Sequence, residues 1–93
     1  MRRLLWSRQA RGQLFDIANY YRQFDPQLAV EMLERIEAAP QPLLEFPYVG
    51  AVATNGSRRW RARRTPYVLL FYGVSDDAVE VVAIRHVRTD GPR

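Results

Sequence analysis

The sequence predicts an α+β fold, in which a hairpin of two helices covers one face of a small, mostly antiparallel sheet. Three observations lead to this prediction. Two neighbouring segments in the first half repeat apolar residues at helical spacing, and a strong helix-start signal separates them. Three segments in the second half are rich in β-branched and aromatic residues, with turn residues between them. A short apolar segment precedes the first helix, so the expected order is β-α-α-β-β-β.

The first strand and first helix follow from the start of the chain. Arg3 to Trp6 is a short strand candidate, and Ser7 stands where a helix N-cap belongs. Apolar residues then recur at positions 10, 14, 17, 18 and 21. This spacing predicts a helix from Arg8 to about Phe24.

The second helix begins at Asp25-Pro26, where Asp serves as the N-cap and Pro occupies the first helical position. Ala29, Met32, Leu33 and Ile36 form its buried stripe, and the helix should end near Pro40 and Pro42. Glu31, Glu34 and Glu37 form an acidic stripe at a spacing of three residues. Because only a few residues join the two helices, they should pack as an antiparallel hairpin.

A loop follows the second helix. In the segment Leu43 to Gly50 we expect Leu44, Phe46 and Tyr48 to dock onto the core. Ala51 to Thr54 is a weak strand candidate, and Asn55-Gly56 is a hairpin-type turn signal.

Three stronger strands complete the prediction, over Arg58–Arg64, Tyr67–Val74 and Ala78–His86. Thr65-Pro66 and Ser75-Asp76-Asp77 supply the turns between them. Tyr67 to Tyr72 is apolar on both faces, which predicts the central strand. The polar tail from Val87 should be frayed.

Composition narrows the possible functions. The 93 residues predict a single domain over 1–93, and the lack of cysteine excludes disulfides and thiol chemistry. The single histidine predicts no metal site, and no cofactor is expected. No segment has the apolar length of a signal peptide or membrane span, so we expect a soluble, cytoplasmic protein with no membrane contact.

The charges are unevenly distributed. The net charge is +4, and all fourteen basic residues are arginine. Five of them fall within Ser57–Arg64, which runs into an apolar segment as SRRWRARRTPYVLLFY. In an extended strand, Arg59, Arg61 and Arg63 share one face, and Trp60 and Ala62 share the other. Because burying three unpaired arginines is prohibitive, this row should line the open face of the sheet or meet the acidic stripe at its edge.

The pattern of residues resembles the RelE/ParE superfamily of toxins from bacterial type II toxin–antitoxin pairs. The resemblance is carried by Trp6-Ser7 with the following helix, by Tyr20-Tyr21, by Asp25-Pro26 and by the Leu43-x-x-Phe-Pro-x-x-Gly segment. It continues through Arg58-Arg59, Pro66-Tyr67-Val68, Phe71-Tyr72 and Ile84-x-His86-x-Arg88. The resemblance covers nearly the whole chain, and the family shares the predicted order of elements.

The resemblance implies two alternative activities. RelE-like members are ribosome-dependent ribonucleases that cut mRNA, whereas ParE-like members bind DNA gyrase and trap it with broken DNA. Both cause growth arrest, and plasmid stabilisation is a role associated with such pairs. Both kinds are neutralised by a cognate antitoxin that wraps the toxin with its C-terminal segment. We expect that segment to be acidic and the complex to be a hetero-oligomer.

The residues at the end of the last predicted strand favour the ParE-like branch. RNA cleavage requires an acid–base pair together with cations on the phosphate. Ribonuclease members typically place a tyrosine or a His-Tyr pair here, but this chain reads Arg85-His86-Val87-Arg88, with no tyrosine after Tyr72 and no lysine anywhere. For a ribonuclease, the candidates would be Arg59, Arg61, Arg85 and His86. The prediction is therefore an inhibitory binding protein rather than an enzyme.

We expect antitoxin and target to dock on one basic surface, made of Arg58, Arg59, Trp60, Arg61, Arg63, Arg85, His86 and Arg88. The first helix, with Met32 and Leu33, should add a second part of the antitoxin groove. Two simpler interpretations stay open. The arginines could form a solvated edge that pairs with Glu31, Glu34 and Glu37, or the chain could be a non-toxic nucleic-acid-binding module in which aromatics alternate with basic residues.

Overall fold

A computed structural model describes residues 1–65 and 68–86 of the chain, except for the side chain of Thr54. Along these residues the elements are β1 (Arg3–Trp6), α1 (Arg8–Arg22), α2 (Pro26–Ala38), the 3₁₀ turn η1 (Gln41–Leu44), β2 (Ala51–Val52), the 3₁₀ turn η2 (Thr54–Gly56), β3 (Arg58–Arg61), β4 (Val68–Val74) and β5 (Ala78–His86). The predicted tail from Val87 lies outside the described residues.

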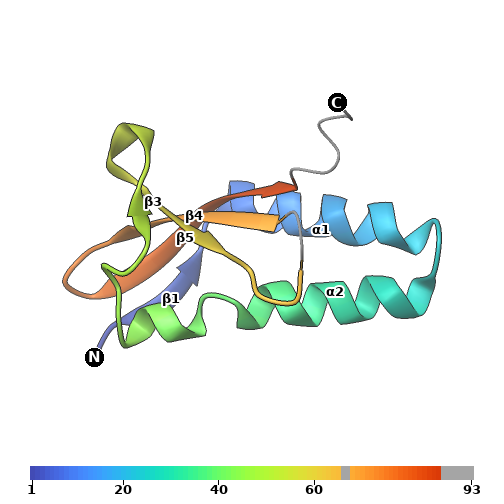
Figure 1. Ribbon diagram of the computed structural model, residues 1–93, viewed down its shortest axis with the longest axis horizontal. Helices are drawn as coiled ribbons and strands as arrows, with labels where there is room; N and C mark the ends of the chain where they lie inside the picture. The colour runs from blue at the N-terminus through green and yellow to red at the C-terminus, as the bar shows by residue number, and fades with distance from the viewer. Residues whose placement is uncertain (66–67, 87–93) are drawn as a thin grey trace.

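The strands form one sheet in the order β1-β5-β4-β3-β2. β1 pairs with β5 in parallel, and the remaining neighbours are antiparallel. Figure 1 shows α1 and α2 side by side as a hairpin, with α1 running along β5. The predicted α+β class and the order of elements are therefore confirmed.

Both helices begin at the predicted caps. The Ser7 hydroxyl accepts a hydrogen bond from the amide of Ala10 at 3.0 Å and donates to the carbonyl of Val82 at 2.9 Å. The Asp25 carboxylate accepts from the amide of Gln27 at 3.0 Å, with Pro26 in the first turn. Ser7 thus starts α1 and also ties it to β5, because one side chain serves both elements.

The core lies between the helix hairpin and the sheet. Its main cluster consists of Ala10, Leu14, Ile17, Met32, Ile36, Ala62, Val68, Leu70, Val81 and Ile84. Met32 is only 4% exposed, so the expectation that it lines an antitoxin groove is wrong. Leu33 is half-buried and packs against this cluster. Phe15 on α1 and Phe24, just after its C-terminal end, are exposed.

The loop before β2 docks differently from the prediction. Leu43 and Pro47 are buried and Leu44 is half-buried, but Phe46 and Tyr48 are about 60% exposed, so their predicted docking is wrong. The loop is instead fixed by the buried hydroxyl of Tyr72, which donates to the Pro47 carbonyl at 2.8 Å. The predicted docking of Leu44 is confirmed, since it packs against the cluster of Leu43, Tyr72 and Val79, and the Tyr72 hydroxyl adds a polar anchor.

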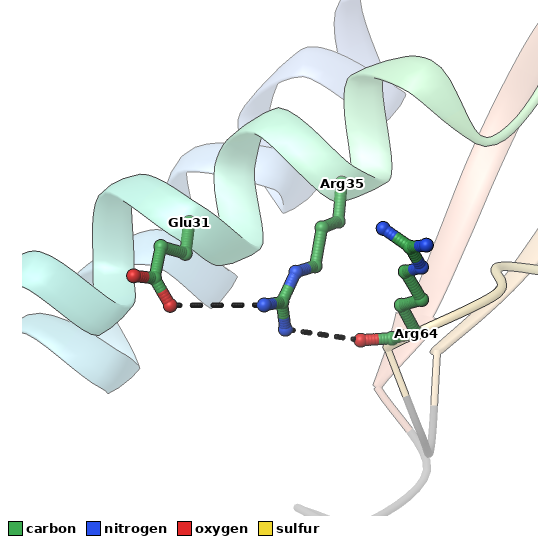
Figure 2. A network of polar contacts seen from close by, with 3 residues as sticks. All are labelled: Glu31, Arg35 and Arg64. Carbon is green, nitrogen blue, oxygen red and sulfur yellow. Dashed lines mark hydrogen bonds and ion pairs between the residues drawn. The ribbon is translucent and has the colours of Figure 1, made fainter.

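β3 is shorter than predicted, because the chain turns directly after Arg61. The Thr65 hydroxyl donates to the carbonyl of Ala62 at 2.7 Å, and Arg64 has a positive φ of 63°. Figure 2 shows Arg35 of α2 bridging to this turn, donating to the Arg64 carbonyl at 3.3 Å while pairing with Glu31 at 3.7 Å. The turn is thus attached to α2.

At the predicted hairpin turn, Asn55 and Gly56 have φ values of 71° and 81°. Left-handed backbone at two successive positions is what an Asn-Gly pair tolerates best. In the part of the chain that the structure describes, neither helix is long and apolar enough to cross a bilayer.

Candidate functional site

The sheet face opposite the helices brings together side chains from three strands. Cα pairing aligns Arg59 with Phe71 and Ala83 across the sheet, and aligns Arg61 with Leu69 and Arg85 in the next row. Their neighbours along each strand, Trp60, Leu70 and Ile84, pack in or against the core. Because side chains alternate along a strand, these two rows point away from the helices. We call this surface the open face and define it by Arg59, Arg61, Leu69, Phe71, Gly73, Val82, Ala83 and Arg85.

A β-bulge in β5 places two consecutive residues on the open face. Phe71 pairs with Ala83, but the next residue, Tyr72, pairs with Val81, so Val82 is the extra residue. Val81 and Ile84 remain buried, whereas Val82 and Ala83 are half-buried. A bulge of this kind lets the strand keep its core contacts on both sides of an irregularity.

The open face is hollowed into a groove of about 900 Å³. Its floor is apolar, and its walls come from the residues around η2 and from Gln9 at the start of α1. Gly73 deepens the groove, because a Cβ built at this position meets no atom within 4 Å. In Figure 1 the η2 turn, which lies between β2 and β3, projects away from the helices.

The electrostatics of the open face are dominated by arginine. Arg59 and Arg61 are exposed, and neither side chain makes an ion pair or hydrogen bond to a residue within 1–65 or 68–86. Arg85 is also exposed, two strands away from Arg61 and so roughly 10 Å from it across the sheet. The acidic residue Glu80 of β5 is exposed on the same face, where it pairs with Gly73 and with Leu5 of β1, but it is not among the residues that line the groove. The groove itself therefore presents positive charge around an apolar floor.

The predicted pairing of the arginine row with the acidic stripe of α2 does not hold for Arg59 and Arg61. Of that stripe, Glu31 pairs within its own helix, with Arg35. The helices cover the opposite face of the sheet, so the stripe and the open face are separated by the strands themselves. Arg59 and Arg61 are thus available to a partner.

Arg58 and Trp60 belong to the helix side of β3 and have structural contacts there. Arg58 donates to the carbonyls of Tyr48 at 3.0 Å and Gly50 at 2.8 Å, and its guanidinium lies 5.3 Å from the centre of the Tyr48 ring. The indole N–H of Trp60 donates to the carbonyl of Ala39 at 3.0 Å. These two residues hold the loop and α2 against β3, so they do not share a surface with Arg59.

The prediction that Arg63 shares a face with Arg59 and Arg61 is wrong, because β3 ends at Arg61. Arg63 lies in the following turn and, together with Arg64, lines a hollow beside the C-terminal end of α2. Strand alternation no longer applies once the chain leaves the extended conformation.

His86 lies on the helix side of β5, away from Arg85. It is 7% exposed, and its Nε2 atom is 2.9 Å from the hydroxyl of Tyr21. The ring also contacts Tyr20, with centroids 5.3 Å apart. The predicted common basic surface therefore keeps Arg85 but not His86, and Arg88 lies outside the described residues.

Sequence reasoning missed the apolar floor of the groove. Leu69, Phe71 and Gly73 occupy alternate positions of β4, which is the available signal for a shared face. The prediction of a central strand buried on both sides hid this alternation. The Tyr21–His86 contact, which joins residues 65 positions apart, had no local signal.

The arrangement of the open face suits binding. Guanidinium groups stay protonated at neutral pH, so they are poor proton shuttles. They bind carboxylates and phosphates through two parallel hydrogen bonds, and an apolar floor gains from being covered. The open face therefore suits an amphipathic acidic segment.

Solved structures of other proteins share this fold. The chain superimposes on a chain of the chromosomal ParDE toxin–antitoxin system from P. aeruginosa with a TM-score of 0.83, 23% identity and coverage of 95% of this chain and 98% of that one. It also matches a YoeB dimer from Staphylococcus aureus with a TM-score of 0.57, 15% identity and coverage of 90% and 94%. At these identities the matches establish the fold.

Sequence comparison establishes the family. Toxin RelE2 of Caulobacter vibrioides is 36% identical to this chain over 86 residues, which cover 92% of this chain and 96% of that protein. The family model described as the ParE toxin of the type II toxin–antitoxin system parDE matches residues 4–91. The chain therefore belongs to the ParE toxin family of type II toxin–antitoxin systems.

Proposed function

We propose that this toxin inhibits DNA gyrase by binding it, and that a cognate antitoxin neutralises the toxin by covering the open face. The observation that carries the proposal is the groove in which Arg59 and Arg85 border an apolar floor of Leu69 and Phe71. The toxin acts in the cytoplasm and arrests cell growth. The toxin and antitoxin genes together stabilise a plasmid that carries them.

The composition of the open face supports binding over catalysis. Among the described residues that line the groove, the ionisable side chains are arginines. General acid–base catalysis requires groups that gain and lose protons near neutral pH, and arginine does not. His86, which has a suitable side chain, faces α1 on the other side of the sheet.

The antitoxin that fits this surface is an acidic segment with apolar residues at regular spacing. Its carboxylates pair with Arg59, Arg61 and Arg85, and its apolar side chains cover Phe71 and Leu69. Such charge pairs accelerate association and set the register of the bound segment. The target uses the same residues, so antitoxin and target exclude each other.

Purified gyrase tests the proposal directly. Added to gyrase, ATP and relaxed plasmid, the chain should reduce supercoiling and increase the amount of cleaved plasmid. The product of the adjacent gene should restore supercoiling. The double variant Arg59→Glu/Arg61→Glu should lose inhibition, while Arg22→Glu, on the exposed surface of α1, should retain it. Full supercoiling at a large molar excess of the folded chain would refute the gyrase target.

A second candidate function is ribosome-dependent cleavage of mRNA. Two observations favour it: the 36% identical relative is named Toxin RelE2, and the Tyr21 hydroxyl lies 2.9 Å from His86 Nε2. A tyrosine–histidine contact of this length could pass a proton. Addition of the chain to translating ribosomes, followed by mapping of mRNA 3′ ends, separates the two candidates. Cut mRNA with unaffected gyrase would select this second function, and Tyr21→Phe should then slow the cleavage.

A further inference from the structure

A second hollow lies on the helix side of the molecule, between the C-terminal end of α2 and the turn after β3. We call it the Trp60 pocket. It has a volume of about 380 Å³, within the range of small-ligand sites. Its lining includes Arg35, Ala38, Ala39, Trp60, Arg63 and Arg64. Because Trp60 and Arg59 point to opposite sides of β3, this pocket is separate from the open face.

The aromatic wall of the pocket can contribute only a ring face. The indole N–H of Trp60 is already used, since it donates to the carbonyl of Ala39 at 3.0 Å. Ala38 and Ala39 are small, so they leave space beside the ring. Trp60 is half-buried and packs against both core clusters, so only the part of its ring that lines the pocket is open. Planar conjugated rings stack on an exposed aromatic surface of this kind.

The charges at the rim of the pocket are three guanidiniums. That of Arg35 is engaged, with Glu31 at 3.7 Å and with the carbonyl of Arg64 at 3.3 Å (Figure 2). The side chains of Arg63 and Arg64 are exposed, and within residues 1–65 and 68–86 they form no ion pair. The C-terminal end of α2 carries the negative pole of the helix dipole, which opposes an anion. Anion binding therefore depends on Arg63 and Arg64.

The backbone at Arg64 gives an independent reason to regard this rim as functional. Its φ of 63° falls in the left-handed region, where glycine or asparagine is less strained than arginine. The bond from Arg35 to the Arg64 carbonyl holds that conformation. Figure 2 shows the Arg64 guanidinium turned toward α2. Strained positions of this kind are concentrated at binding sites.

We propose that the Trp60 pocket binds a nucleotide, with its base stacked on Trp60 and its phosphate held by Arg63 and Arg64. A carboxylate side chain would use the guanidiniums and leave the indole face uncovered, whereas a nucleotide uses both. Guanidinium forks match phosphate oxygens in two-bond geometry. The shared ligand chemistry is a nucleoside 5′-phosphate, supplied either as a free nucleotide or as one unit of a single strand. The pocket acts independently of the gyrase proposal.

Indole N–H signals in nuclear magnetic resonance spectra provide the readout, with the Trp60 signal assigned through Trp60→Phe. Adenosine 5′-monophosphate should shift that signal saturably. Adenosine alone and inorganic phosphate alone should each bind with an affinity at least about tenfold lower. A short oligodeoxyadenylate distinguishes the two sources. Tighter binding per nucleotide than the monophosphate indicates a strand, and equal binding indicates a free nucleotide.

Variants test the assigned contacts in the full-length chain. Arg63→Gln/Arg64→Gln should weaken nucleotide binding about tenfold or more, and Arg22→Gln should not change it. Because both substitutions at Trp60 remove the indole signal, their affinities are measured by isothermal titration calorimetry. Trp60→Phe keeps an aromatic face and should retain most of the affinity, whereas Trp60→Leu should lose it. Absence of a saturable shift at millimolar nucleotide in the folded chain would overturn the proposal. Tighter binding of an acidic peptide to the same indole signal would also overturn it, because the occupant would then be a protein.

Discussion

The backbone amide of Gly50 donates a hydrogen bond to the buried hydroxyl of Tyr72 across 3.0 Å. The same hydroxyl donates to the Pro47 carbonyl at 2.8 Å, so one oxygen atom serves two backbone groups of the loop before β2. Tyr72→Phe leaves both groups without this partner. We expect it to lower the free energy of unfolding by about 1–3 kcal/mol. Chemical denaturation followed by circular dichroism measures the change, and an unchanged midpoint would contradict this role.

Gly50 also occupies a position that no larger residue fits. A Cβ placed there comes within 2.6 Å of the Tyr72 hydroxyl and even closer to the backbone carbonyl of Arg59. We expect Gly50→Ala to cost about 1–3 kcal/mol through overpacking, and to displace β3, which carries the docking arginines. Gly73→Ala is the matched control, since its Cβ meets nothing. Equal melting temperatures for the two variants would show that β3 moves to accommodate the added Cβ without a loss of stability.

Charge reversal on the open face should abolish neutralisation. If Arg61 pairs with an acidic antitoxin residue, Arg61→Glu removes the pair and adds a repulsion, at a cost of about 2 kcal/mol or more, or roughly a 30-fold loss of affinity. Isothermal titration calorimetry with the antitoxin encoded beside this chain measures the loss. Arg22→Glu is the control for net charge. If both variants bind equally well, the antitoxin covers a different surface.

Filling the groove should block binding without unfolding the protein. Gly73 lies on the floor of the groove, and nothing occupies the space where a side chain would project. Gly73→Leu should therefore keep or slightly raise the melting temperature while weakening antitoxin binding and gyrase inhibition together. Loss of only one of these would show that antitoxin and target use different parts of the sheet.

Replacing Gly12 should stabilise the protein. It lies in the middle of α1, and a Cβ there meets no atom within 4 Å. Gly12→Ala should raise the free energy of unfolding by about 0.5–1 kcal/mol, because alanine loses less backbone freedom in a helix. Differential scanning calorimetry detects the change. A destabilised variant would indicate that the exposed side of α1 is strained in this position.

Much of the fold could be predicted because local signals and long-range structure agree. Ser7 and Asp25-Pro26 set the helix starts through contacts within three residues, which sequence patterns describe well. The bounds of β5 were predicted in full, since Asp76-Asp77 precedes an alternating apolar strand. These elements required no knowledge of the rest of the chain.

The site was less predictable because its composition depends on register. Arg63 was misplaced because the turn after Arg61 contains no glycine or asparagine, and its left-handed residue is Arg64, held by Arg35 from a distant helix. The β5 bulge, which brings Val82 onto the open face beside Ala83, likewise arises from strand pairing. The position of a residue along its own strand does not reveal which side chains of the two neighbouring strands lie beside it.

The parallel pairing of β1 with β5 has a consequence for biosynthesis. Arg3 pairs with Ala78, and Trp6 with Val81, so the first strand has no partner until the last one has been made. The helix hairpin can form early on the ribosome, but its apolar side stays uncovered until β4 and β5 emerge. The open face takes residues from the same late strands. A nascent toxin therefore has no docking surface during most of its synthesis, and its ability to act arises together with its final fold.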